Sequence, residues 1–229
     1  MKGKYGFLVL VGVLALFTYF ALTTDQLPGD LAIAQWVQSL AGPESLGPIP
    51  DFLFWMGAKG VAGALLVPVC VWLWLKGHRT EAVFVALVGS PDLLNIPLRE
   101  LIDRPRPTTV PLNAFGGGHG ASFPSGYALH VLLWGGFLLY LSRSVVKRRA
   151  LRTVLWLALG LYIPATGLWL IYDGRHWPSD VLGGYVYGAF YLTVLIWGYK
   201  KYTAWQCRYA AEEFAVTSRP LAWILRVVN

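Results

Sequence analysis

The sequence has 229 residues, of which 56% are hydrophobic and 14% charged, and its mean hydropathy is +0.52. A soluble globular domain carries about 25% charged residues, so this composition excludes an ordinary soluble protein. The formal net charge of +7 would suit a nucleic-acid partner. The basic residues are instead distributed as they are in membrane proteins, as described below, and we predict no binding to nucleic acid.

Apolar residues gather in six runs, each close to the ~20 residues that a helix needs to cross the hydrocarbon core. The runs cover residues 5–23, 52–75, 81–98, 124–141, 153–171 and 180–199. Because lipid cannot satisfy open strand edges, we expect an all-α, polytopic membrane bundle of six transmembrane helices. We expect this membrane domain to span residues 1–202, with an interfacial cytoplasmic tail at 203–229. Lys59 and Asp92 fall inside two runs, where ionised groups are costly, so we expect them to pair; a polar path toward the site is the alternative.

Lys and Arg residues are spread unevenly over the connections between these runs. If the N-terminus is cytoplasmic, most of them fall on the inner side, whereas residues 24–51 hold four carboxylates and no Lys or Arg. This asymmetry predicts a multi-pass protein of a plasma or inner membrane, with both termini in the cytoplasm. Four arginines fall on the outer side against this rule, namely Arg99, Arg104, Arg106 and Arg175. Ordinary loop charge would explain them, but their neighbourhood suggests a second reason.

The outer connection after the third run contains Arg99 and, seven residues later, Arg106 followed by Pro107. Seven residues are close to two helical turns, so the two side chains can project toward one point if the helix persists. Planar guanidinium groups match the oxygen geometry of phosphate. This spacing indicates a phosphate-binding pair.

The next outer segment is rich in glycine and ends in Pro124, Ser125 and Gly126 at the start of the fourth run. A helix N-terminus presents free backbone N–H groups and the positive end of the helix dipole, which together favour an anion. The alternative is that Ser125 simply caps the helix, and both roles can hold at once.

The last outer segment contains His176 and, four residues later, Asp180 at the start of the sixth run. A carboxylate bonded to one imidazole nitrogen fixes the tautomer and leaves the other nitrogen available for attack. A pair that caps the helix is the alternative. The charge-derived topology places all three segments at the same membrane face, which favours a shared phosphate site.

These residues resemble the type 2 phosphatidic acid phosphatase family, which is related to the vanadium haloperoxidases. The family pattern is Lys-x6-Arg-Pro, then Pro-Ser-Gly-His, then Ser-Arg-x5-His-x3-Asp. The resemblance implies that His176 forms a phosphohistidine and that Asp180 orients it. It also implies that four residues hold the phosphate, namely Arg99, Arg106, Ser125 and Gly126. Since no His, Cys or carboxylate cluster has metal-ligand spacing, we expect no metal and no other cofactor.

The sequence departs from the family pattern at two motifs. Tyr127 stands in place of the second histidine, and Leu170 in place of the third-motif arginine, with Trp169 before it. A phenol with a pKa near 10 is a poor proton donor at neutral pH. Four residues are candidates to compensate, with Arg175 or Arg104 replacing the guanidinium and His130 or His119 supplying the proton. Structural roles are the alternative for both histidines.

The function expected from the resemblance is removal of phosphate from a membrane lipid phosphate at the extracytoplasmic face. A lipid diphosphate releases a stable phosphate monoester and needs no acid, so Tyr127 shifts the expectation toward polyprenyl-type diphosphates. Two alternatives remain open. One is a catalytically silent relative that binds or transports phospholipids, and the other is a lipid phosphotransferase.

Overall fold

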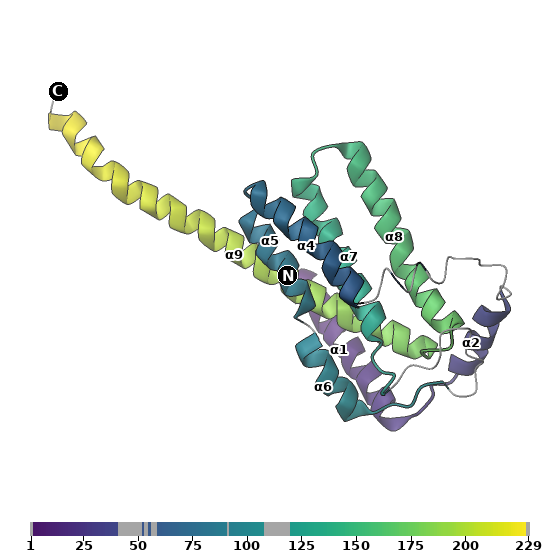
Figure 1. The fold of residues 1–229 in the computed structure, drawn as a ribbon. Helices are drawn as coiled ribbons and strands as arrows, with labels where there is room; N and C mark the ends of the chain where they lie inside the picture. Colours follow the sequence, from purple (N-terminus) through teal and green to yellow (C-terminus); the bar gives the residue numbers. More distant parts are fainter. Residues whose placement is uncertain are drawn as a thin grey trace. The chain divides into compact units, whose positions relative to one another are not determined.

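A computed structural model describes residues 2–40, 52, 55, 59–90, 92–107 and 120–227, and all regular elements in these ranges are helices (Figure 1). The elements are α1 (Lys2–Thr23), α2 (Asp30–Ser39), α4 (Lys59–Leu75), α5 (Arg79–Ala86), the 3-10 turn η1 (Leu87–Gly89), α6 (Asp92–Ile102), α7 (Gly126–Val145), α8 (Arg149–Tyr172) and α9 (Pro178–Val227). The predicted all-α class is confirmed for this part of the chain. The short helix α2, in the segment between the first two predicted spans, was not predicted.

Five helical segments are long and apolar enough to cross a membrane. They are Lys4–Thr23, Arg79–Ile102, Gly126–Val145, Arg149–Tyr172 and Pro178–Glu213, and Ala64–Leu75 is a shorter apolar helix. A multi-pass membrane protein is therefore confirmed, but the predicted count of six spans is not. The second predicted run is described as a continuous helix only from Lys59, which leaves 17 residues. The expected pairing of Lys59 with Asp92 lies outside the described side chains.

The chain divides into two compact units, residues 1–192 and residues 193–229, and α9 contributes to both. In the first unit, α7 packs along α8 and α4 packs along α5. In the second unit, the rings of Tyr202, Trp205 and Tyr209 form a continuous row on the helix. Such aromatic rows are typical of membrane interfaces. The predicted boundary after residue 202 stays a prediction.

Glycines allow the first turns of α9 to approach α7 closely. A Cβ on Gly184 would lie 2.5 Å from the carbonyl oxygen of Ser125, and one on Gly188 would lie 2.8 Å from that of Leu129. Hydrogen in place of Cβ therefore lets the two backbones touch. This contact brings the N-terminus of α9 beside the N-terminus of α7, where two of the predicted site motifs are found.

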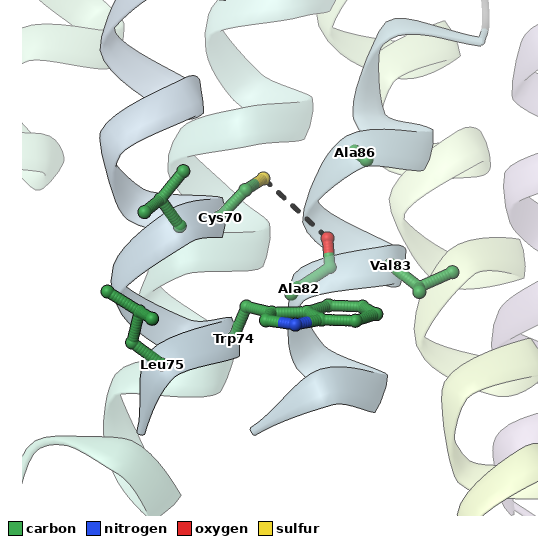
Figure 2. Close-up of a pocket in the computed structure, with 7 residues that line it drawn as sticks. Cys70, Trp74, Leu75, Ala82, Val83 and Ala86 are labelled. Carbon is green, nitrogen blue, oxygen red and sulfur yellow. Dashed lines mark hydrogen bonds between the residues drawn. The ribbon is translucent and has the colours of Figure 1, made fainter. Parts of the chain in front are cut away.

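An apolar cavity of about 320 Å³ lies between α4 and α5 (Figure 2). Its lining is formed by Cys70, Val71, Trp74, Leu75, Ala82, Val83 and Ala86. The thiol of Cys70 donates a hydrogen bond to the carbonyl of Ala82 at 3.6 Å. None of the predicted site residues lines this cavity, so the candidate chemistry has to be sought at the helix ends.

Candidate functional site

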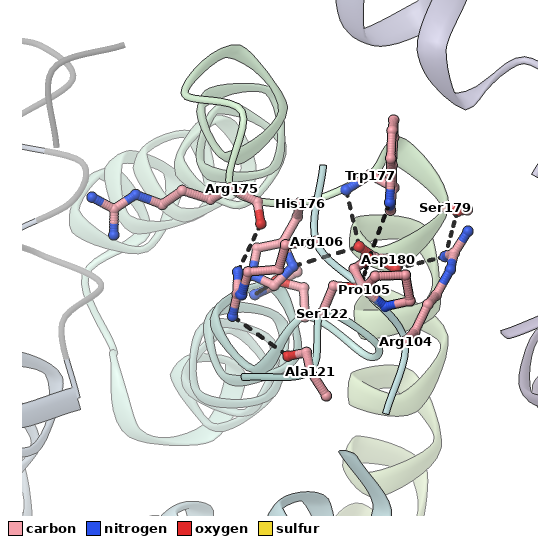
Figure 3. A network of polar contacts seen from close by, with 12 residues as sticks. Arg104, Pro105, Arg106, Ala121, Ser122, Arg175, His176, Trp177, Ser179 and Asp180 are labelled. Carbon is pink, nitrogen blue, oxygen red and sulfur yellow. Dashed lines mark hydrogen bonds and ion pairs between the residues drawn. The ribbon is translucent and has the colours of Figure 1, made fainter. Parts of the chain in front are cut away.

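Three loops meet where α6 ends and where α7 and α9 begin (Figure 3). Ser122, just before α7, donates its backbone N–H to the carbonyl of Arg104 at 2.8 Å and its hydroxyl to that of Pro105 at 3.0 Å. From the other side, the indole N–H of Trp177 donates to the Pro105 carbonyl at 3.2 Å. Proline cannot donate a backbone hydrogen bond, so its carbonyl is the group that anchors this segment. The Pro-Arg-Pro segment is thus fixed between the other two loops.

Arg106 lies directly beside His176. Its Nη1 donates to the carbonyl of Arg175 at 2.7 Å, and its Nε donates to that of Gly120 at 3.1 Å. Held in this way, Nη1 is 3.4 Å from the Nε2 of His176. Burial, with a contribution from nearby Arg99, lowers the pKa of Arg106 to about 10, so the side chain stays positive at neutral pH.

Arg99, in the last turn of α6, binds the same backbone carbonyl as Arg106. Its Nη2 donates to the carbonyl of Ala121, which also accepts from Arg106 at 3.5 Å. A Cβ on Gly126 would lie 3.9 Å from Nη1 of Arg99 and 3.3 Å from the amide nitrogen of Asn95. The structure therefore brings the two arginines together next to the first residue of α7, although α6 ends at Ile102 and does not continue to Arg106 as the prediction had required. Asn95, which is buried here, was not predicted.

Ser125 is the N-cap of α7. Its hydroxyl oxygen accepts from the backbone N–H of Ala128 at 3.4 Å, and its own N–H donates to the carbonyl of Asp180 at 3.1 Å. The simple capping role is therefore confirmed. The predicted phosphate contact of Ser125 and Gly126 stays a prediction, and their position near Arg99 is compatible with it.

His176 and Asp180 face each other at the start of α9. Nδ1 of the imidazole is 3.7 Å from Oδ2 of the carboxylate, which is longer than a hydrogen bond. The same Oδ2 accepts from the backbone N–H of Trp177 at 2.9 Å. Burial lowers the pKa of His176, which is 6% exposed; Asp180 opposes this shift, and Arg106 and Arg99 add to it. A neutral imidazole with Nε2 facing a guanidinium is suited to attack on an anion.

The two arginines predicted to compensate for Leu170 have other partners. Arg104 is completely buried and forms ion pairs with Asp180 and Asp30. Arg175 pairs through Nε with Asp173, and its guanidinium lies 5.6 Å from the ring centre of Trp169. Figure 3 shows the Arg175 side chain extending away from His176. Carboxylates bind both guanidinium groups in the structure, and the predicted replacement role of these arginines stays a prediction.

The positions that depart from the family pattern lie in an apolar cluster. The Tyr127 ring is 6.2 Å from that of Trp169, and both Trp169 and Leu170 are buried. Nδ1 of His130 is 2.7 Å from the carbonyl oxygen of Gly126, so this imidazole is bound to its own helix. His119 lies outside the described residues. Within the described ranges, no group of three His, Cys, Asp or Glu side chains is placed to hold a metal.

The fold and the site define an all-helical, multi-pass membrane protein with a histidine and two arginines gathered at the ends of its helices. The chain belongs to the PAP2 superfamily, which its sequence matches over residues 80–204. Phosphatidylglycerophosphatase B of Bacillus subtilis (strain 168) is 26% identical over 138 residues. That match covers 58% of this chain and 65% of the relative, slightly less than two thirds of its length.

Two solved structures have a similar fold. The first transmembrane PAP2 type phosphatidylglycerolphosphate phosphatase from Bacillus subtilis gives a TM-score of 0.69 at 22% identity, covering 82% of this chain and 95% of that one. LpxE of Aquifex aeolicus gives a TM-score of 0.57 at 22% identity, and the match covers 75% of this chain and 97% of that one. At this level of identity, the likeness establishes the fold and leaves the substrate to be argued from the site.

Proposed function

We propose that the protein is a metal-independent membrane lipid phosphatase that uses His176 as its nucleophile. The observation that carries this proposal is the position of Nε2 of His176, 3.4 Å from Nη1 of Arg106. Arg99 contacts the same Ala121 carbonyl as Arg106, so two positive charges lie beside the nucleophilic nitrogen. Membership of the PAP2 superfamily and the similarity to phosphatidylglycerophosphatase B of Bacillus subtilis support the same class of reaction.

In the proposed reaction, the lone pair of Nε2 attacks phosphorus and the bond from phosphorus to the lipid-side oxygen breaks. Arg99, Arg106 and the N-terminus of α7 stabilise the charge on the phosphoryl oxygens, which is the main contribution that proteins make to phosphoryl transfer. Water then attacks the phosphohistidine, which releases inorganic phosphate and restores the neutral imidazole. Asp180 stabilises the positive imidazole ring while it carries the phosphoryl group.

The leaving group distinguishes between substrates. An alkoxide that leaves a lipid monophosphate must take up a proton, whereas a diphosphate releases a lipid monophosphate that is already a stable anion. Tyr127 occupies the position of the family's proton donor, and the ring of His130 is bound to the Gly126 carbonyl. We therefore propose a lipid diphosphate, such as a polyprenyl diphosphate, as the preferred substrate. The distribution of basic residues supports a site on the extracytoplasmic face.

The second candidate function is a catalytically silent relative that binds or transports phospholipids. The apolar cluster around Tyr127, Trp169 and Leu170, where the family pattern has polar groups, favours it. Phosphate release from a panel of lipid mono- and diphosphates separates the two functions, with His176→Ala as the control. We expect release that depends on His176 and is fastest for the diphosphate. Lipid binding without release would support the silent relative, and transfer to a second lipid would indicate a phosphotransferase.

A further inference from the structure

The guanidinium of Arg104 is fully buried, with a side chain that is 0% exposed, as is that of Asp180 beside it. Its Nη1 donates to Oδ1 of Asp180 at 2.6 Å and to the hydroxyl of Ser179 at 2.8 Å. Its Nη2 donates to Oδ2 of Asp30 at 3.1 Å, and its Nε to the carbonyl of Asp25 at 3.2 Å. A buried cation is tolerated only when it is paired and its donors are satisfied, and here all three of its nitrogens donate.

Asp30, the first residue of α2, is the second carboxylate of this network and is 3% exposed. Its Oδ1 accepts from the backbone N–H of Ser179 at 2.9 Å. Its Oδ2 accepts from the Ser179 hydroxyl at 2.6 Å and from the N–H of Leu27 at 2.9 Å, besides Arg104. The first outer segment of the chain is thus fixed to the first turn of α9, four residues or fewer from His176 in sequence.

The charges of the network do not cancel. One guanidinium, that of Arg104, contacts two carboxylates, so the group carries one net negative charge when all three are ionised. Asp180, a member of this network, faces Nδ1 of His176, whereas Arg106 faces Nε2. If Asp30 were neutral, Arg104 would balance Asp180 alone, and the carboxylate facing His176 would stabilise a positive imidazole less well.

We infer that Asp30 is a positioning residue for His176, which acts through Arg104 and Asp180 to keep a negative charge behind the imidazole. The inference rests on the proposed function for its kinetic consequence. Arg104 donates a hydrogen bond to one oxygen of Asp180, and the backbone N–H of Trp177 donates to the other. These two bonds fix the plane of the carboxylate. Asp30 supplies the charge that Arg104 would otherwise cancel.

Other charged groups also act on His176 and have to stay constant in a test. Arg106, from the loop after α6, and Arg99, from α6 itself, lower its affinity for a proton, whereas Asp180 of α9 raises it. The Asp173–Arg175 ion pair lies at the end of α8. A substitution of Asp30 removes none of these charged groups, so their charges are the same in the wild type and in the variants.

The test compares Asp30→Asn with Asp25→Asn. Asp25 is an exposed carboxylate five residues earlier whose backbone carbonyl, not its side chain, binds Arg104, so Asp25→Asn removes the same charge from the same segment. With a polyprenyl diphosphate in detergent micelles, we expect Asp30→Asn to lower kcat at least about tenfold with little change in KM. The acidic limb of kcat should move down by about 0.5–1 pH unit, since a weaker anion stabilises the protonated imidazole less. Asp25→Asn should change neither kcat nor the position of the acidic limb.

An NMR titration of the His176 ring in detergent micelles compares Asp30→Asn with Asp25→Asn in the absence of substrate. The measured quantity is the pH at the midpoint of the titration. We expect its midpoint to fall in Asp30→Asn and to stay in place in Asp25→Asn. Equal midpoints in both variants would overturn the inference, even if the wild type proves to be an active phosphatase. A wild type that releases no phosphate would instead contradict the proposed function, while the titration still decides the role of Asp30.

A third variant covers the case in which Asp30→Asn does not fold. Asp30→Glu keeps the charge but, with one more methylene group, cannot keep the four hydrogen bonds of the shorter side chain. We expect its kcat to fall at least about threefold with the acidic limb unmoved, because the charge remains while the geometry of Arg104 and Asp180 loosens. A downward shift of the acidic limb as large as that expected for Asp30→Asn would overturn the inference, because the glutamate keeps the charge.

Discussion

Replacing Arg106 with lysine keeps the positive charge but removes the planar group that reaches several acceptors at once. In the structure the guanidinium donates to the carbonyls of Arg175 and Gly120, and these two bonds hold Nη1 3.4 Å from Nε2 of His176. A single ammonium group cannot hold both carbonyls and a phosphoryl oxygen. We expect the loss of one charge-assisted hydrogen bond in the transition state, worth about 2 kcal/mol. That corresponds to a fall of roughly thirtyfold in kcat/KM.

The assay is phosphate release from a polyprenyl diphosphate, measured for wild type, Arg106→Lys and Arg143→Lys. Arg143 lies near the end of α7, 4.8 Å from the ring centre of Trp156, and is not among the predicted site residues. We expect its substitution to leave kcat/KM within about twofold, because it removes only a surface contact. Equal activities for Arg106→Lys and the wild type would refute the assignment of Arg106 to the phosphoryl oxygens.

Three further predictions follow from the same geometry. Because burial lowers the pKa of His176, kcat/KM should not begin to fall on the acid side until the pH is below about 6.5, and a limb above that value would contradict this. Gly184→Ala places a Cβ 2.5 Å from the Ser125 carbonyl and should lower the free energy of unfolding by about 2 kcal/mol in a detergent melting assay. Gly12→Ala, which meets open space, should not do so. Tyr127→His should raise hydrolysis of a lipid monophosphate roughly 100-fold and leave the diphosphate rate little changed; equal effects on the two would argue against the missing acid.

Local patterns predicted the helices and the arginine pair. A long apolar run in lipid has to form a helix, because a helix satisfies its own backbone hydrogen bonds. Five of the spans were therefore found from composition alone. Arg99 and Arg106 meet at Ala121 although α6 ends at Ile102 between them, so the seven-residue spacing found the pair while the loop after α6, not a continuous helix, positions Arg106. His176 and Asp180 also face each other, although His176 lies two residues before α9 begins.

The network around Arg104 could not be predicted in the same way. Arg104 and Arg106 share one Pro-Arg-Pro segment, and nothing in that pattern states which of them faces His176. Helix α6 ends just before Asp103, whose φ of 46° lies in the left-handed region that is rare for a residue other than glycine. Asp30 joins the network from a helix far away in sequence, a contact that depends on tertiary packing. The only indication in the sequence was the surplus of carboxylates in the first outer segment.

Trapping of the covalent intermediate tests the central claim most directly. The purified protein in detergent is mixed for milliseconds with a polyprenyl diphosphate labelled in its terminal phosphate and is then quenched in alkali, which preserves phosphohistidine. Peptide mapping should find the label on His176 in the wild type and none in His176→Ala. Rapid phosphate release with no label on His176, or with undiminished release by His176→Ala, would contradict the account.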